Sequence, residues 1–482
     1  MKAFPERTRG GSSVPERAPC QPARLKAARR GRRAALSTAL AVALAGGAIA
    51  QDRRQVVEPR IPPACAVLNS SLPLPPAGEL AEADEQALDT LRIQRSLDAC
   101  PAGRAVVLRA RPGKPAFLTA LLRLRAGVAL VIDAGAVVLA SRNPRDYDVR
   151  PGLCGTLDDS GDGCHALISG DGVADAAVMG GGMIDGRGGA RLLGQTISWW
   201  DLAQEASRRR LVQNVPRLIV LQRCDNFTLY RITLRNSPNF HVVYAGGDGF
   251  TAWGVTIYAP QTARNTDGID PISATNVTIT HCFIHAGDDH IAIKADELGA
   301  ATHMTIAHNH FYAGHGMAIG SDTYGGVSAI RVTDLSIDGA DNGIRIKSNS
   351  TRGGRVQDVE YEDVCIRDTN YPILMDSKYS FNGAGRNLLP SFTGIVLRNV
   401  HVTGPGKVQL QGYDAAHRLG MQFDNLVLSP PASIEVKASD ADLTLGPGPV
   451  NFLPEGRNVR VLGAPGDGPS IACEDKFVPL PR

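Results

Sequence analysis

The chain has 482 residues, with 51 lysines and arginines against 48 aspartates and glutamates, and a formal net charge of +3. Ten of those cations and only two of the acids lie in residues 1–50, so this segment carries +8 and residues 51–482 carry −5. That balance is not typical of proteins that bind nucleic acids through a basic surface. The 52 glycines outnumber the 12 Phe, 10 Tyr and 3 Trp together, and the apolar residues form short runs. Many short strands joined by tight turns are therefore expected, rather than long helices.

The first 50 residues have the pattern of an export signal. A basic region with twin arginines ends at Arg33, an uncharged run follows, and the run closes on Ala48-Ile49-Ala50, the small-x-small form of a cleavage site. We predict a signal peptide over residues 1–50, exported by the Sec or the Tat route. The mature protein is then secreted or periplasmic, with no attachment to the membrane. A transmembrane span and a start codon assigned too early are the alternatives.

An even number of cysteines remains after the predicted signal, and an exported protein can form disulfides. Cys154 and Cys164 flank a short polar loop, and Cys65 lies upstream of Cys100, which ends a helix-like stretch. We predict these two pairs. Three other cysteines lie in or beside apolar strand segments and are interpreted as small buried hydrophobic residues: Cys224, Cys282 and Cys365. No set of cysteines and histidines has the spacing of a metal site.

Residues 51–84 are rich in proline and irregular, apart from an apolar run near Cys65. A short helix is expected over residues 87–99, where apolar residues recur at near-helical spacing: Leu88, Leu91, Ile93 and Leu97. Strand-like segments follow at residues 105–108 and 128–132. A helix at the head of a strand array would cap the end of a solenoid, which otherwise exposes unpaired backbone and an apolar core.

From residue 224 onward the sequence repeats, with a period of about 22 to 29 residues. Each unit begins with an apolar step that is followed by alternating residues: Phe227, Phe250, Val277, Met304, Ile330, Val359 and Ile395. Several units then have a second short strand: residues 291–294, 317–320, 344–347 and 373–376. This pattern predicts an all-β fold, a right-handed parallel β-helix with one coil per repeat, as a single domain over residues 85–482. Leucine-rich repeats, the structural rival, need an asparagine and leucine spacing that is absent.

The repeat makes a geometric prediction about polar residues. If the second strands stack, four residues are aligned: Ile269, Ile291, Met317 and Ile344. The residues two positions earlier then form a column with a spacing of about 4.8 Å: Asp267, Asp289, His315 and Asn342. Because side chains alternate along a strand, Arg345 and Lys347 should point away from the core, toward the acids of this column.

Carboxylates forced together at coil spacing repel one another, so the arrangement requires a function. Asp267 and Asp289 could hold a water as base, while Asp288 keeps a proton and acts as acid, as in an inverting glycosidase. Arg345 and Lys347 could grip a sugar carboxylate. His315 could hydrogen-bond a carboxylate and change its proton affinity, or bind the sugar. Each motif alone is more typical of a turn or a solvated strand, and only their joint occurrence in order favours a catalytic site.

Four sequence islands together resemble the signatures of glycoside hydrolase family 28, the polygalacturonases, and most closely the bacterial type: Asn265-Thr266-Asp267, Gly287-Asp288-Asp289, Gly314-His315-Gly316 and Arg345-Ile346-Lys347. The likeness extends over residues 85–430. It implies hydrolysis of α-1,4-linked galacturonan in pectin with inversion, by a monomer without metal or cofactor. It also implies the roles of single residues: Asp288 as general acid, Asp267 and Asp289 activating water, His315 supporting catalysis, and Arg345, Lys347, Tyr379 and Asn265 binding substrate. Fungal members have a cysteine where this chain has His290, so their local disulfide is not expected.

Two alternatives stay open at this point. One is a β-helical pectate lyase, in which the acids hold Ca²⁺, and the other is a carbohydrate-binding protein that kept the fold without activity. Endo or exo action depends on whether residues 143–200 wall off one end of the cleft. The pair Trp199-Trp200 in this stretch could stack on sugar rings or pack inside the protein.

Overall fold

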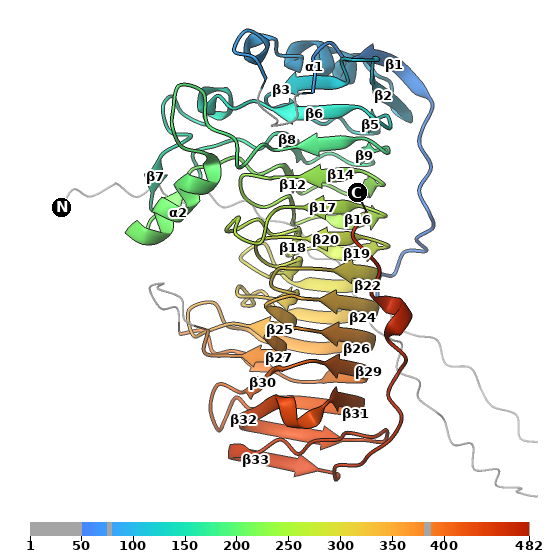
Figure 1. Ribbon diagram of the computed structural model, residues 1–482, viewed down its shortest axis with the longest axis vertical. Coiled ribbons are helices and arrows are strands. Elements are labelled where there is room, and N and C mark those ends of the chain that lie inside the picture. Colours follow the sequence, from blue (N-terminus) through green and yellow to red (C-terminus); the bar gives the residue numbers. More distant parts are fainter. Residues whose placement is uncertain (1–50, 75–79, 380–386, 482) are drawn as a thin grey trace, which may run out of the picture. The chain divides into compact units, whose positions relative to one another are not determined.

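The described residues wind into stacked coils of short parallel strands. A computed structural model describes residues 51–74, 80–379 and 387–481, so the predicted signal peptide lies outside the described residues and stays a prediction. The right-handed parallel β-helix expected from the repeats is confirmed. Figure 1 shows the coils stacked from α1 and β1 at one end to β33 at the other.

The strands form three parallel ladders, named A, B and C. Ladder A begins with β1 (Ala64–Asn69), β2 (Arg104–Arg109), β5 (Val128–Ile132), β9 (Ala177–Met179), β13 (Phe227–Tyr230), β16 (Asp248–Trp253) and β19 (Thr275–Thr280). Ladder B begins with β3 (Ala116–Thr119), β6 (Val137–Ala140), β10 (Met183–Asp185), β14 (Thr233–Arg235), β17 (Thr256–Tyr258) and β20 (Phe283–His285). Longer strands then span both ladders: β22 (Ala301–Phe311), β24 (Val327–Asp338), β26 (Arg355–Arg367), β29 (Ile395–Thr403) and β31 (Leu419–Ser429).

Ladder C carries the polar residues predicted to form the site. It consists of β4 (Leu122–Arg123), β8 (Ile168–Asp171), β12 (Ile219–Gln222), β15 (Val242–Ala245), β18 (Ile269–Ile272), β21 (Ile291–Ile293), β23 (Met317–Ile319), β25 (Asn342–Lys347), β27 (Tyr371–Asp376) and β30 (Gly406–Gln411). The remaining strands are β28 (Ser391–Phe392), β32 (Ile434–Leu445) and β33 (Gly456–Leu462), and the antiparallel pair β7 (Leu157–Asp158) and β11 (Val212–Gln213). Short 3₁₀ turns occur at Asp84–Gln86, Pro144–Tyr147, Pro431–Ser433 and Glu474–Lys476.

The register of ladder A matches the predicted repeat at every step. Seven residues stack in successive coils: Phe227, Phe250, Val277, Met304, Ile330, Val359 and Ile395. The residue before each of them has a left-handed backbone conformation: Asn226, Gly249, Asn276, His303, Ala329, Asp358 and Gly394. Asn, Asp, His and Gly are the residue types that enter this region at lowest cost, which explains why they recur before each apolar step.

A capping helix covers the first coils. α1 (Thr90–Ala99) lies at the end of the stack, where Ile93 and Leu97 are fully buried in the core. The predicted start at residue 87 was three residues too early, and Leu88 and Leu91 are 40% and 69% exposed. The helix begins at Thr90, and residues before it cannot turn the same face to the core. Among the described residues, no helix combines the length and apolar character needed to cross a membrane.

The stretch expected to form a wall contains a helix that the sequence analysis did not predict. α2 (Trp199–Arg209) projects from the side of the coils in Figure 1, close to β7. Ser198 and Asp201 form a capping box at its start, and this Ser-x-x-Asp pattern was the available signal. Trp199 is buried against Tyr147, and the indole nitrogen of Trp200 donates to the Ser237 carbonyl at 2.9 Å. The packing alternative therefore describes the tryptophan pair better than sugar stacking.

Both predicted disulfides are present, and a third one corrects an expectation. Cys65 bonds to Cys100 and Cys154 to Cys164, while Cys224 and Cys282 are free and buried as predicted. Cys365 was interpreted as a buried hydrophobic residue, but it is bonded to Cys473. A separation of 108 residues leaves no local spacing from which to infer the pair. The partner comes from the tail after β33.

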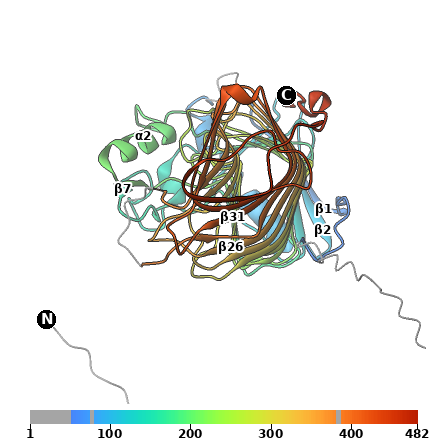
Figure 2. The ribbon, with the colours of Figure 1, turned by 90° about the horizontal axis from the view of Figure 1, so that it is seen from below.

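The C-terminal tail returns along the outside of the coils, as Figures 1 and 2 show. Besides the disulfide it makes three contacts: Lys476 pairs with Asp334, Phe477 lies under the Arg367 guanidinium, and the Val478 carbonyl accepts from the Tyr312 hydroxyl at 2.9 Å. The disulfide thus closes a loop that contains the last coils and holds the tail against β24 and β26.

We expect Cys473→Ser to lower the free energy of unfolding by about 2–4 kcal/mol, because the unfolded chain gains the entropy of an open loop. Denaturant unfolding with and without reductant measures the effect. Reduction should cost the wild-type protein more stability than it costs the variant, and equal losses in both would contradict a stabilising role for this crosslink.

Candidate active site

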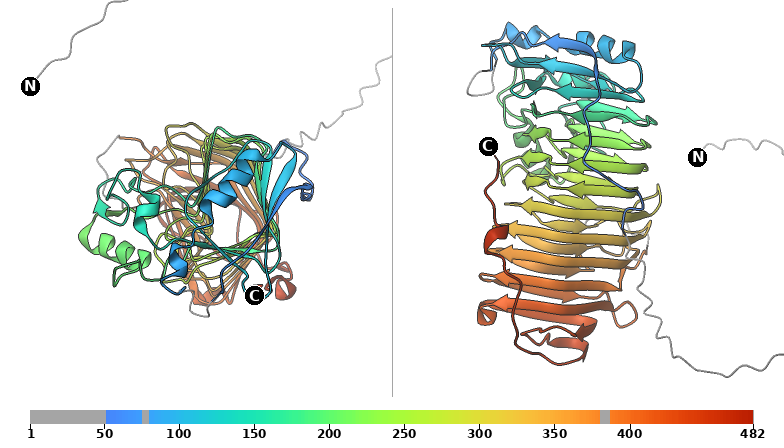
Figure 3. Two further views of the ribbon diagram at one scale, coloured as in Figure 1. Left: turned by 90° about the horizontal axis from the view of Figure 1, so that it is seen from above. Right: turned by 90° about the vertical axis from the view of Figure 1, so that its right-hand side faces the viewer.

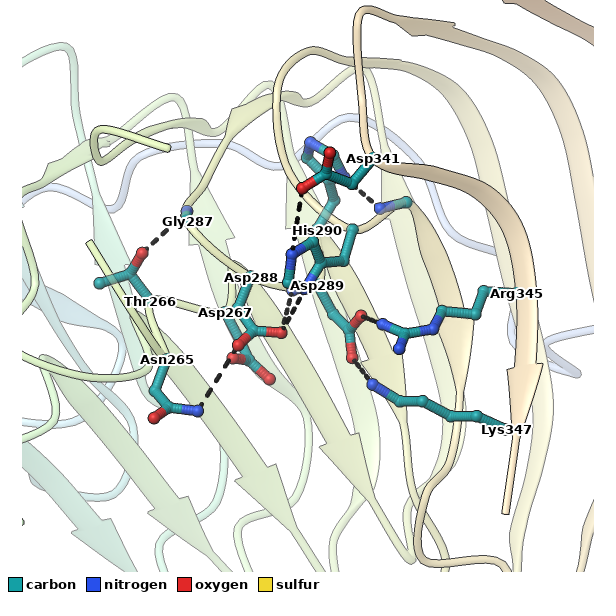
Figure 4. Close-up of polar contacts among 12 residues, drawn as sticks. Asn265, Thr266, Asp267, Gly287, Asp288, Asp289, His290, Asp341, Arg345 and Lys347 are labelled. Carbon is teal, nitrogen blue, oxygen red and sulfur yellow. Dashed lines mark hydrogen bonds and ion pairs between the residues drawn. The ribbon is translucent and has the colours of Figure 1, made fainter. Parts of the chain in front are cut away.

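The predicted column lies at the edge where the chain enters ladder C. The register of β18, β21, β23 and β25 aligns the four expected apolar residues: Ile269, Ile291, Met317 and Ile344. The residues two positions earlier consequently occupy equivalent places in successive coils: Asp267, Asp289, His315 and Asn342. Neighbouring coils are separated by about 4.8 Å, so these side chains meet at contact distance. Figure 4 shows the aspartates converging with Arg345 and Lys347.

The loops that carry the aspartates are locked to each other through Thr266. Its hydroxyl donates to the Ala263 carbonyl at 2.6 Å and accepts from the Gly287 amide of the next coil at 2.9 Å. Gly287 fits only because it has no side chain, since a Cβ there would lie 2.0 Å from the Ala263 oxygen. The bond sets Asp267 and Asp288 at a fixed separation, which explains the chemical need for Thr and Gly in these two islands.

Asp289 is buried and holds two cations from the coil after next. Its Oδ1 accepts from Arg345 Nη1 at 3.0 Å, and its Oδ2 accepts from Lys347 Nζ at 2.6 Å. Both cations are themselves more than nine-tenths buried. Ala318 lies opposite Arg345 in the intervening coil, and its small side chain leaves room for the guanidinium to reach across. The sequence prediction brought these residues together correctly, but it did not foresee that the cations pair with Asp289.

Asp288 faces a different set of partners. His315 Nδ1 lies 2.9 Å from Asp288 Oδ1, and the Asn265 amide donates to Oδ2 at 3.5 Å. The other ring nitrogen of His315 lies 3.5 Å from Asp341, a carboxylate that the sequence analysis did not single out. His315 therefore bridges two carboxylates, and Asp288 is oriented by groups on both sides of it.

Asp267 belongs to a buried triad that sequence reasoning missed. Lys294 Nζ lies 3.4 Å from Asp267 Oδ2 and makes a closer hydrogen bond to Asp270. One oxygen of each aspartate is buried with no hydrogen-bond partner. A signal for Lys294 was present in the sequence, because Ile291-Ala292-Ile293-Lys294 repeats the pattern of residues 344–347 two coils later. The two lysines thus occupy equivalent places along ladder C and point to the same side.

The carboxyl groups differ in their affinity for protons. Burial, together with the negative charge of Asp270, raises the pKa of Asp267 well above its usual range. Burial would also raise the pKa of Asp288, but the hydrogen bond and charge of His315, with help from Lys347 and Arg345, hold this pKa below its usual range. Burial opposes a charge on His315, yet its bond to Asp288 raises the pKa of the imidazole above the ordinary value. Without substrate, protons are therefore held by Asp267 and His315.

His290 fixes the loop that carries His315. Its ring accepts from the Gly316 amide at 2.9 Å through Nδ1, lies 3.2 Å from the Ala313 carbonyl through Nε2, and stacks on Phe311. Burial lowers the pKa of His290 to about 3, so the ring is neutral. No disulfide involves this segment, as expected from the sequence. Instead, the His290 imidazole connects its own segment to the loop at Ala313 and Gly316 by hydrogen bonds.

Tyr379 lies beside the cations, where the resemblance placed it. The centre of its ring is 5.5 Å from the Arg345 guanidinium carbon and 5.4 Å from Lys347 Nζ. Its backbone is fixed by two hydrogen bonds, from its amide to the Ser348 carbonyl and from the Asn349 side chain to its own carbonyl. An aromatic face next to two cations is a favourable contact and forms one side of the site.

Three residues of the site offer atoms close enough to share a metal ion. One ligand atom each from Asp288, Asp289 and His315 lies within 4.8 Å of the other two. However, both oxygens of Asp289 already bond to Arg345 and Lys347, and those two positive charges repel a further cation. The donor set is therefore a poor fit for Ca²⁺, which prefers several free oxygen ligands.

Residues 152–440 match the family model of glycosyl hydrolases family 28. The chain belongs to this family. It is 37% identical to a polygalacturonase of Ralstonia nicotianae, over 90% of this chain and 94% of that one. It is 40% identical to an endo-polygalacturonase of Pectobacterium carotovorum subsp. carotovorum, over 83% of this chain and 96% of that one. The solved structure of a polygalacturonase from Erwinia carotovora ssp. carotovora superposes with a TM-score of 0.71 at 37% identity, over 85% and 96% of the two chains.

Membership of family 28 makes this protein a glycoside hydrolase. Of the three function classes that the sequence left open, it supports the hydrolase, the class for which both the family and the relatives are named. The site geometry agrees with hydrolysis, since several carboxylates converge where a sugar carboxylate could also find cations.

We expect Asp267→Asn to raise the free energy of unfolding at pH 7, because the neutral amide removes the cost of ionising a buried carboxyl next to Asp270. The pKa of Asp267 is higher in the folded state, so its ionisation costs stability as the pH rises from the unfolded value through the folded one. Chemical denaturation at pH 7 and at pH 4 measures this, and the gain should shrink at the lower pH.

Asp270→Asn is the matched control. Burial raises the pKa of Asp270 as well, but Asp270 is the closer partner of Lys294, and the substitution leaves this buried cation poorly paired. We expect the loss of this pair to outweigh the relief of burial, so that the stability falls. A loss of stability in both variants would contradict the like-charge repulsion inferred for Asp267.

Proposed function

We propose that the protein hydrolyses the α-1,4-galacturonosidic bonds of homogalacturonan in pectin. The observation that carries this proposal is the convergence of Asp267, Asp288 and Asp289 with Arg345 and Lys347 in one buried cluster. A neutral polysaccharide has no use for two buried cations beside the reacting groups, whereas a uronate carboxylate can bind them. The polygalacturonases found among the relatives support the same substrate.

In the proposed mechanism Asp288 protonates the leaving oxygen. Asp288 shares a proton with His315 across the 2.9 Å contact. The pair keeps this proton up to a pH that is set by the raised pKa of the imidazole. Coupled groups of this kind titrate as a unit, so the low pKa of Asp288 in the free protein does not prevent the pair from acting as acid. Asn265 and Asp341 keep the two members in place.

Water is the proposed nucleophile, activated by Asp267 and Asp289. One oxygen each of Asp288 and Asp289 lies within 4.8 Å of the other, so the separation alone does not exclude a retaining mechanism. Direct attack by Asp289 would require an oxygen to leave Arg345 or Lys347, which makes water the better candidate. Inversion follows, and the first product from an α-linked chain should have the β configuration. Its anomeric signal in NMR tests this step.

We expect Asp288→Asn to reduce kcat on polygalacturonate by about 10²–10⁴-fold, the usual contribution of a positioned general acid. Release of reducing ends measures it. The matched control is Asp296→Asn, which changes an aspartate outside the cluster that pairs only with Ser273 and the local backbone. Near wild-type activity of Asp288→Asn would refute the assignment.

Two further observations separate hydrolysis from lyase action. The wild-type reaction should give no ultraviolet-absorbing product, and a chelator should leave its activity unchanged. A calcium-dependent lyase would form such a product and would lose its activity with the chelator.

The pH profile should show two limbs with separate origins. Activity rises as Asp267 ionises, at a pH above the usual range of a carboxyl, and falls as His315 loses its proton, above the ordinary histidine value. His315→Asn should therefore move the alkaline limb of kcat/KM to lower pH by a unit or more, because Asp288 must then hold the proton alone. An alkaline limb that stays in place would mean that another group controls it.

A further inference from the structure

The column of the active site continues for two more coils toward the N-terminus. The Leu218 amide donates to the Phe240 carbonyl at 3.1 Å, and the His241 amide donates to the Asp267 carbonyl at 2.8 Å. These bonds continue the register of β12, β15 and β18, so Arg217, Phe240 and Asp267 occupy equivalent places in successive coils. Arg217 thus lies about two coil spacings, or roughly 10 Å, from the catalytic aspartate along the axis.

A cavity of about 990 Å³ opens beside this extension of the column. One side is formed by α2 and β11, the other by the segments that lead into ladder C, and Asn265 in its lining also contacts Asp288. Its charged lining is mainly cationic: Arg210, Arg217 and Arg264 against the single acid Asp159. The cavity and the active site are therefore two parts of one groove, in which Gln213 and Asn265 are joined by a 3.3 Å hydrogen bond.

The Arg217 side chain is held without a protein counter-ion. Its guanidinium packs over the Phe240 ring at 5.3 Å, and the opposite cation on that ring is Lys294 at 4.5 Å. Its Nε is buried with no acceptor, and within the described residues it pairs with no carboxylate. Arg223, which follows β12 of ladder C, is by contrast paired with Asp171. An unpaired, partly buried cation costs free energy, and this cost is recovered when an anion binds.

We propose that this cavity is a binding subsite for a second uronate carboxylate of the polysaccharide, with Arg217 and Arg264 as its donors. The inference rests on the proposed function, because it assumes a chain with a carboxylate on every sugar. Arg217 supplies two nitrogens to a carboxylate, and Phe240 fixes its plane and separates it from Lys294. The helix α2, which lines the other side of the cavity, then contributes to substrate length preference as well as to the core.

Binding tests the subsite without relying on turnover. Titration calorimetry is performed on Asp288→Asn protein with galacturonate oligomers from dimer to octamer. Adding Arg217→Gln should weaken binding of the long oligomers by about tenfold to a hundredfold, the usual effect of losing a charge-assisted pair. Adding Arg223→Gln instead, which removes an exposed and paired cation, should leave binding unchanged. Equal affinities in the two backgrounds would overturn the proposal.

Activity gives an independent readout in the otherwise wild-type enzyme. Arg217→Gln should raise KM for long oligomers and leave kcat/KM for the shortest cleaved oligomer within about twofold, because that substrate does not reach the cavity. Arg217→Lys should recover part of the affinity. The melting temperature of Arg217→Gln should change little, since the side chain makes no ion pair in the described residues and loses only its packing on Phe240. A lower melting temperature, or an equal loss on all lengths, would show a structural role and overturn the subsite.

The two proposals fail separately. If the wild-type protein does not hydrolyse polygalacturonate, the proposed function fails, while binding of oligomers that depends on Arg217 still supports the subsite. If hydrolysis occurs and Arg217→Gln matches Arg223→Gln at every length, only the subsite is refuted.

Discussion

Stacking of one coil on the next forces Asp267, Asp270, Asp288 and Asp289 into a small volume, and the rest of the site depends on balancing their charge. Isolated carboxylates at this spacing would take up protons rather than ionise. Arg345 and Lys347 compensate Asp289, and Lys294 compensates the pair Asp267 and Asp270. The β-helix tolerates this crowding of charges because its backbone is fixed independently of the site. A core of stacked isoleucines and valines, distributed over all the coils, holds it in place.

Much of this could be predicted from sequence because a parallel β-helix converts periodicity directly into contact. Once the step residues of ladder A were recognised, the register placed Asp267, Asp289 and His315 next to one another, and strand alternation pointed Arg345 and Lys347 toward them. Residues that touch across neighbouring coils lie far apart in the sequence, but they occupy the same position in successive repeats. The same logic could have found Lys294, since it lies two coils before Lys347 in an equivalent place.

The features that sequence did not give are those outside the repeat. α2 belongs to an insertion with no periodic partner, so only its capping box marked it. Cys473 lies in the returning tail, and its distance from Cys365 along the chain carries no information about their distance in space. Arg217 precedes the region in which the repeat is clear, and a single arginine before a strand is unremarkable until the register shows which column it joins. The pairing of Arg345 and Lys347 with Asp289 was also hidden, because sequence gives the face of a side chain but not its partner.

In the proposed mechanism, that pairing gives the two cations a second part besides binding substrate. In the free protein they hold both oxygens of Asp289. A uronate carboxylate that enters the site competes for the same donors, and each bond that it takes frees an oxygen of Asp289 to accept a proton from water. In the mechanism proposed above, substrate binding and activation of the water are then linked through Arg345 and Lys347. A neutral sugar in the same position would leave Asp289 bound to its cations, so this linkage gives a physical reason for specificity that does not depend on shape.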